Sequence, residues 1–218
     1  MKKLYFNPGC ALCIYKPDMA ERLLPYLRQI CGEVALHEIC CRHAPKVEEN
    51  AVIINVCAGC DKRFGGLYPG VGTISLWEVL DQSDLFPYPD YEGMQLSVQD
   101  ACPVRKKPEV HRAIRSLLRK MNIEIIETEL HGTRALCCGD SLYPAQPLEQ
   151  VHAAMKRRAD SMPTEHVAVY CVSCIKAMHI GGKSPRHMVD LLFEEPTTPE
   201  VYDTVEWHRQ LQSYIDTH

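Results

Sequence analysis

Cysteine is the residue type with the most chemistry to offer in this chain, because 12 of the 218 residues are cysteines. Ten of them form two sets with the same internal order: a single cysteine, an adjacent pair and a Cys-x-x-Cys motif. The first set is Cys10, Cys40, Cys41, Cys57 and Cys60, and the second is Cys102, Cys137, Cys138, Cys171 and Cys174. In a reducing compartment, cysteines clustered in this way indicate metal binding or redox chemistry rather than structural disulfides.

Each set contains one thiol too many for a structural zinc ion. A zinc ribbon uses four ligands in two knuckles, whereas the two Cys-x-x-Cys motifs lie in different halves of this chain. Five thiolates exceed the closed tetrahedral shell of zinc. Soft thiolate sites with more than four ligands favour polynuclear iron–sulfur chemistry, so we expect all ten cysteines to be cofactor and metal ligands.

The elements that must position these cysteines also occur twice. In the first half, apolar patterns predict strands at 4–6, 34–36 and 51–56 and helices at 18–30 and 74–80. In the second half, the same order is predicted from strands at 96–98, 123–126 and 166–170 and helices at 108–121 and 186–192. A further helix is expected at 147–160 in the second half alone. We infer a duplication with its boundary between residues 81 and 93.

Alternating strands and helices predict an α/β fold of two Rossmann-like modules with parallel sheets. Cys10, Cys57, Cys102 and Cys171 each follow a predicted strand directly. Function in such sheets collects at the carboxyl ends of the strands, so each module is expected to present its cysteines at one edge. Duplicated modules are further expected to be related by a pseudo-twofold axis, with the two sets facing each other.

The second set resembles the CCG, or cysteine-rich, domain family, whose pattern is a single Cys, then Cys-Cys-Gly, then Cys-x-x-Cys. Cys137-Cys138-Gly139 carries the central signature. The first set departs from it, because Arg42 follows the pair and the gap to Cys57 is shorter. Two such modules in one chain resemble the heterodisulfide reductase subunit that carries two CCG modules. The resemblance implies one module at 1–85, another at 94–193 and a C-terminal tail, expected to be helical, at 194–218.

The resemblance implies a non-cubane 4Fe-4S cluster on the five cysteines of each module. It further implies an iron–sulfur oxidoreductase subunit of the disulfide-reductase type, which reduces or forms a disulfide of a small thiol substrate. No catalytic residue beyond the cluster ligands is assigned. The alternative from another class is a non-catalytic electron-transfer subunit of a dehydrogenase complex that oxidises 2-hydroxy acids.

Electrons are expected to come from, or go to, a partner subunit that carries iron–sulfur or flavin groups. The chain has no ferredoxin-type cysteine run and no glycine-rich dinucleotide fingerprint after a strand. The formal net charge of −4 argues against nucleic acid as a partner. No apolar run is long enough to span a membrane, and Pro8 interrupts any signal core, so a cytoplasmic location is expected.

Other interpretations of single residues remain open at this stage. Zinc is the alternative cofactor in the first module, where Arg42 would also be strained if it took the backbone of the missing glycine. Cys10 and Cys13 form a Cys-x-x-Cys after a strand, as in glutaredoxins; otherwise Cys13 and Cys31 are expected to be buried structural thiols. His43 and His187 are expected to be structural. The basic run at 105–107 forms a solvated face or attracts an anionic substrate or partner.

Overall fold

The computed structural model describes residues 2–218 and divides into two α/β units. The first unit is the chain up to Pro87 together with His208–His218, and the second is Tyr88–Trp207. Each unit contains a four-stranded sheet in which every pair of neighbouring strands is parallel. The predicted α/β fold with two parallel sheets is therefore confirmed, while the pseudo-twofold relation stays a prediction.

The first sheet has the strand order β2-β1-β3-β4, so the two central strands are the two that precede Cys10 and Cys57. Its strands are β1 (Leu4–Asn7), β2 (Val34–Leu36), β3 (Val52–Asn55) and β4 (Gly72–Ser75). The helices of this unit are α1 (Cys10–Tyr15), α2 (Met19–Cys31), α3 (Ala58–Leu67) and α4 (Leu76–Asp81).

The helices α2 and α4 show how local sequence sets the element boundaries. Met19, Leu23 and Leu27 recur at helical spacing and are fully buried, and the helix continues through Pro25. Ser75 caps α4 with a capping box, in which its hydroxyl accepts from the first turn and Glu78 accepts from the backbone of Ser75.

The second sheet repeats the first with the order β6-β5-β7-β8. Its strands are β5 (Gln95–Gln99), β6 (Glu124–Ile125), β7 (His166–Val169) and β8 (Ser184–His187). Its helices are α5 (Pro108–Lys120), α6 (Leu148–Asp160), α7 (Val172–Ile180) and α8 (Met188–Leu192). Short 3-10 turns are η1 (Cys102–Val104), η2 (Gly132–Arg134) and η3 (Asp140–Leu142).

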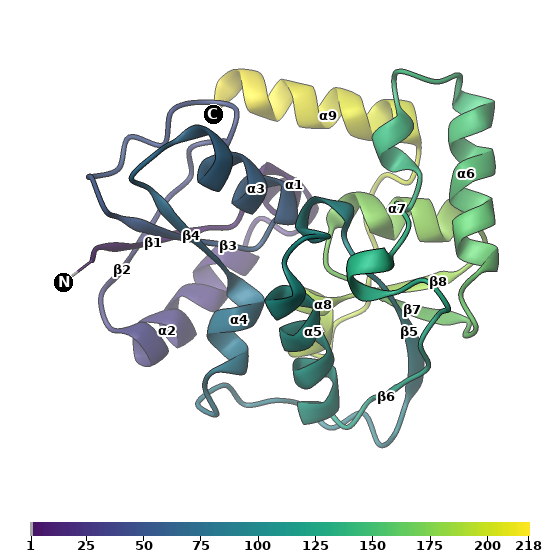
Figure 1. Ribbon diagram of the computed structural model, residues 1–218, viewed down its shortest axis with the longest axis horizontal. Coiled ribbons are helices and arrows are strands. Elements are labelled where there is room, and N and C mark those ends of the chain that lie inside the picture. Colours follow the sequence, from purple (N-terminus) through teal and green to yellow (C-terminus); the bar gives the residue numbers. More distant parts are fainter. Residues whose placement is uncertain (1) are drawn as a thin grey trace. The chain divides into compact units, whose positions relative to one another are not determined.

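The helix α6 has no counterpart in the first unit, as the sequence predicts. In the second unit α6 packs beside α7, the helix that carries Cys174 (Figure 1). Val151 and Met155 of α6 are fully buried. The insertion between the cysteine pair and the Cys-x-x-Cys motif is therefore a packed part of the second unit.

The C-terminal tail contains the helix α9 (Thr204–Thr217), which confirms the helix expected there. The boundary of the two units falls within α9, between Trp207 and His208, so residues 194–218 are divided between the units. In the part of the chain that the structure describes, no helix is both long and apolar enough to cross a membrane.

Candidate functional site: five thiols in each unit

The carboxyl ends of the two central strands place two cysteines at equivalent positions in each unit. In the first unit Cys10 is the first residue of α1, after β1, and Cys57 is the N-cap of α3, after β3. In the second unit Cys102 is the first residue of η1 and Cys171 is the N-cap of α7. Unpaired backbone N–H groups at a helix N-terminus can favour a thiolate over a thiol. Among these cysteines, the pKa of Cys57 is lowered to about 7 by hydrogen bonds from the Cys60 thiol and from the backbone of Cys60 and Gly59, whereas the pKa values of Cys10 and Cys102 are raised.

The five thiols of the first set lie in a row joined by side-chain hydrogen bonds. The order along the row is Cys10, Cys40, Cys41, Cys60 and Cys57. The pKa of Cys40 is lowered because the thiols of Cys10 and Cys41 hydrogen-bond to its sulfur. The pKa of Cys10 is raised, first by its hydrogen bond to Cys40 and then by burial. The structure therefore brings together all five predicted ligands of this set.

The second set forms the same row in the same order: Cys102, Cys137, Cys138, Cys174 and Cys171. The pKa of Cys137 is lowered because Cys102 and Cys138 hydrogen-bond to its sulfur, as for Cys40. Cys137 also contacts the hydroxyl of Ser141 at 3.0 Å. In both units the first cysteine of the pair is thus the thiol with the most hydrogen-bond support for the charged form.

A buried amide on the last residue of a central strand fixes the approach to each cysteine pair. In the first unit the Asn7 side-chain nitrogen donates to the carbonyl of Ile39, the residue before Cys40, at 3.2 Å. In the second unit the Gln99 side-chain nitrogen donates to the carbonyl of Leu136, the residue before Cys137, at 3.1 Å. Neither amide was predicted to be a site residue, although a polar residue that ends an apolar strand is a signal that could have found both.

Glycines next to the thiols are required by backbone geometry in each unit. A Cβ on Gly9, whose φ is +78°, would lie 3.2 Å from the sulfur of Cys60. A Cβ on Gly139, whose φ is +108°, would lie 2.8 Å from the backbone nitrogen of Met155 in α6. Side chains at either position would meet strain as well as contact.

The strain expected at Arg42 is not found. Arg42 stands where the second unit has Gly139, but its φ is not positive. The close partner of Gly139 is α6, and the first unit has no such helix. The backbone after Cys41 therefore turns without a glycine, and the position in this unit that requires a glycine is Gly9.

Two buried cations lie beside the second set, and neither forms an ion pair with a carboxylate of residues 2–218. The ammonium of Lys176 lies 3.7 Å from the centroid of the Trp207 ring. Burial lowers the pKa of Lys176 to about 8, against the opposing charges of Asp140 and Cys171. Arg158 hydrogen-bonds to neutral oxygens, the closest being the side-chain oxygen of Gln99 at 2.6 Å.

Both cations have the thiols of the second set among their electrostatic partners. Burial lowers the pKa of Arg158, while the charges of Asp100, Cys174, Cys138 and Cys137 raise it. A buried charge is costly unless an opposite charge compensates it. The carboxylates of Asp100 and Asp140 supply part of that compensation, and the second set, once it carries negative charge, adds to it. Neither cation was predicted from the sequence, and no pattern signals their burial.

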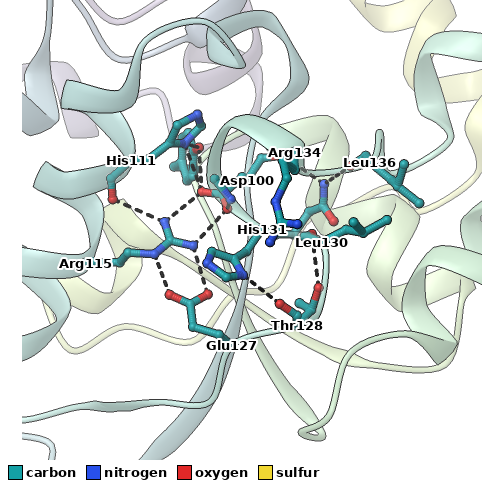
Figure 2. A network of polar contacts seen from close by, with 12 residues as sticks. Asp100, His111, Arg115, Glu127, Thr128, Leu130, His131, Arg134 and Leu136 are labelled. Carbon is teal, nitrogen blue, oxygen red and sulfur yellow. Dashed lines mark hydrogen bonds and ion pairs between the residues drawn. The ribbon is translucent and has the colours of Figure 1, made fainter.

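A polar network holds the segment that leads into Cys102 (Figure 2). The carboxylate of Asp100, fully buried, accepts two hydrogen bonds from Arg115 at 2.9 Å and one from the backbone of Gly132 at 2.6 Å. His111 and Tyr170 also contact Asp100, at 3.0 and 3.2 Å. The Arg115 charge and these hydrogen bonds hold the pKa of Asp100 below its usual range, against its burial.

Cys13 lies outside the row of thiols and has Tyr214 of α9 as its side-chain hydrogen-bond partner. The Cys-x-x-Cys of Cys10 and Cys13 therefore does not act as a pair here, since Cys10 hydrogen-bonds to Cys40. Cys13 and Cys31 are both partly exposed, so the expectation that they are buried structural thiols is wrong as to burial.

The two histidines near the motifs have structural contacts, as expected. The ring of His43 contacts the carbonyl of Ile215 in α9 at 2.8 Å. His187 is buried and caps α8, where its ring accepts from the backbone of Val189 at 3.4 Å.

The arrangement differs from the shell of a single metal ion. Within residues 2–218, no group of three or more His, Cys, Asp or Glu side chains is placed to hold one metal ion. All 12 cysteines are free of disulfides. Comparison of the sequence with protein-family models and with curated proteins finds no match. The fold and the site thus define a two-unit α/β protein with a row of five free thiols at the strand ends of each unit.

Proposed function

We propose that this chain is an iron–sulfur oxidoreductase subunit that reduces or forms a disulfide, similar to the two-module CCG subunit of heterodisulfide reductase. One observation carries the proposal: the same five-thiol row, in the same order, occurs at the same strand ends of both units. A row of five sulfurs suits a cluster of several irons better than it suits one ion, which closes its shell with four ligands.

The residues around the rows fit a bound cluster in charge and in shape. Lys176 and Arg158 provide positive charge that no carboxylate neutralises by an ion pair within residues 2–218, and an iron–sulfur cluster on thiolates is anionic. Gly9 and Gly139 keep the backbone beside the thiols free of side chains. The non-cubane 4Fe-4S form expected from the CCG resemblance would use all ten cysteines as ligands.

The bound groups would supply one-electron transfer at each set, and a disulfide takes up two electrons on reduction. The chain's own residues would hold the five thiols of each set at fixed positions and determine the charge around them. Asn7 and Gln99 anchor the segments before the cysteine pairs, and hydrogen bonds from the start of α3 help to lower the pKa of Cys57. A partner subunit with iron–sulfur or flavin groups would exchange electrons with this one.

Anaerobic preparation followed by iron, acid-labile sulfide and zinc analysis tests the proposal. We expect about four irons and a matching amount of sulfide per set. Cys137→Ser should remove metal from the second set alone, and Cys40→Ser from the first alone. Zinc without sulfide in both sets would overturn the proposal, and zinc in the first set alone would restrict it to the second unit.

Activity is tested separately from metal content. Protein with both sets filled should reduce a small disulfide when a low-potential one-electron donor is supplied, and either variant should lose this activity. If iron and sulfide are present but either variant retains full activity, the two-set reaction is wrong. The chain would then be an electron-transfer subunit, as in the alternative interpretation.

A further inference from the structure

The second unit contains a basic cavity that the proposed redox chemistry does not use. Its volume is about 360 Å³, within the range of small-molecule sites. One wall is the N-terminal half of α5, with His111, Arg112 and Arg115, and another is η2, with Thr133 and Arg134. Glu127 is the one carboxylate among the lining residues.

The arginines that line this cavity differ in how many of their hydrogen-bond donors remain available for a ligand. Arg115 makes five hydrogen bonds, to both oxygens of Asp100, both of Glu127 and the carbonyl of His111, so its donors are used within the protein (Figure 2). Arg112 is exposed and makes no hydrogen bond or ion pair to any residue in the range 2–218. Arg134 is also exposed and makes one weak contact, 3.4 Å to a backbone carbonyl.

The polar network makes the two walls a fixed frame. Asp100 accepts hydrogen bonds from Arg115 and contacts His111 on α5, and it accepts from the backbone of Gly132 at the start of η2. The frame fixes the two segments that carry Arg112 and Arg134 relative to each other before any ligand binds, which lowers the entropic cost of binding. His111 lines the cavity, and its Nε2 is buried without a hydrogen-bond partner among residues 2–218.

We propose that this cavity binds a small dianion with carboxylate or phosphate oxygens, held between Arg112 and Arg134. Guanidinium groups match the geometry of carboxylate and phosphate oxygens, and two of them lining one cavity suit a ligand with two negative charges. The exposed cations Arg105 and Lys106 shortly precede Pro108, which lines the cavity, and add positive charge to this part of the chain. Arg115 acts as a positioning residue, because it holds the frame and has no donor left for the ligand.

Titration calorimetry on the whole chain, at constant ionic strength, tests the proposal with malonate and inorganic phosphate as probes and malonamide as a neutral control. Arg112→Gln and Arg134→Gln should each weaken binding of the dianion by about tenfold or more. Arg119→Gln is the matched control, because it removes an exposed charge from the same helix outside the cavity. It should leave binding within about twofold, as expected for a screened distant charge.

Three results would overturn the proposal: no binding of either dianion, equal binding of malonamide, or an Arg119→Gln effect as large as those of the cavity variants. Amide NMR shifts give a second measure, since Gly132 and Thr133 should respond to malonate in the unaltered chain and not in the Arg112→Gln/Arg134→Gln double variant. The test does not depend on the thiol sets. Failure to bind dianions therefore leaves the iron–sulfur proposal intact, and absence of iron leaves the cavity proposal intact.

Discussion

The side-chain amide of Gln99 reaches from the end of β5 to the carbonyl oxygen of Leu136, 3.1 Å away, and so fixes the residue before Cys137. The same side chain accepts from buried Arg158 at 2.6 Å, so one amide joins the central strand, the cysteine pair and α6. Asn7 makes the equivalent bond to Ile39 in the first unit. The cysteine pairs are thus placed by hydrogen bonds from the sheet, not by their own segments alone.

Gln99→Leu should destabilise the second unit and weaken metal retention there. The substitution leaves the Leu136 carbonyl without its donor and Arg158 without its closest acceptor, which we expect to cost about 1–3 kcal/mol for each buried group left unsatisfied. Gln95→Leu on the same strand is the control, because Gln95 is exposed and, within residues 2–218, its side chain bonds only to exposed Glu124. Denaturant unfolding and iron content measure both effects, and equal behaviour of the two variants would contradict the anchoring role.

Gly139→Ala should be more harmful than an alanine at another glycine with positive φ. Both Gly139 and Gly182 take left-handed backbone, but a Cβ at Gly182 meets nothing within 4 Å, whereas one at Gly139 contacts Met155. Gly182→Ala should therefore cost about 1–2 kcal/mol from backbone strain alone. Gly139→Ala should cost more and loosen α6. The comparison requires the free energy of unfolding of both variants, and a smaller loss for Gly139→Ala would refute the close packing of α6.

Lys176→Met should lower the reduction potential of the second centre, because it removes a buried positive charge that stabilises the reduced, more negative form. Lys62→Met is the matched control: Lys62 follows Cys60 by two residues, as Lys176 follows Cys174, but it is exposed. EPR-monitored redox titration of both variants gives the potentials. An unchanged second potential in Lys176→Met, or an equal change in Lys62→Met, would show that Lys176 does not tune the centre.

Cys13→Ser and Cys31→Ser should retain full iron and sulfide, because neither thiol belongs to a row. Cys60→Ser and Cys174→Ser should each lose the metal of their own set. Loss of metal in Cys13→Ser would favour a Cys10 and Cys13 pair as ligands and contradict the assignment of Cys40 as the partner of Cys10. Elemental analysis of the four variants, prepared without oxygen, makes the comparison.

Three strands of each sheet and the two thiol sets could be predicted from the sequence because both depend on local pattern. The fourth strands, β4 and β8, were missed, since each runs directly into a short helix and its last residues were predicted as part of that helix. Apolar runs such as 51–56 predict buried strands, and a cysteine directly after a strand lies at the sheet edge whatever its neighbours are. In the first unit the sequence pointed to the position of Arg42 as the one that needs a glycine, but the structure requires it at Gly9. The φ of Gly9 is positive, and a Cβ there would contact Cys57 and Cys60, which no local pattern reveals. The cavity between Arg112 and Arg134 depends on contacts between α5 and η2, which no spacing in the sequence encodes.

The helix α6 has a kinetic consequence for the thiols of the second unit. Oxidants and chelators reach buried sulfurs through local openings of the fold, and the free energy of such an opening depends on the packing that must be broken. In the second unit that packing includes α6 against Gly139 and α7, whereas the first unit has no helix between Cys41 and Cys57. Although the two sets contain the same five thiols, we therefore expect oxidants and chelators to react with the second set more slowly than with the first.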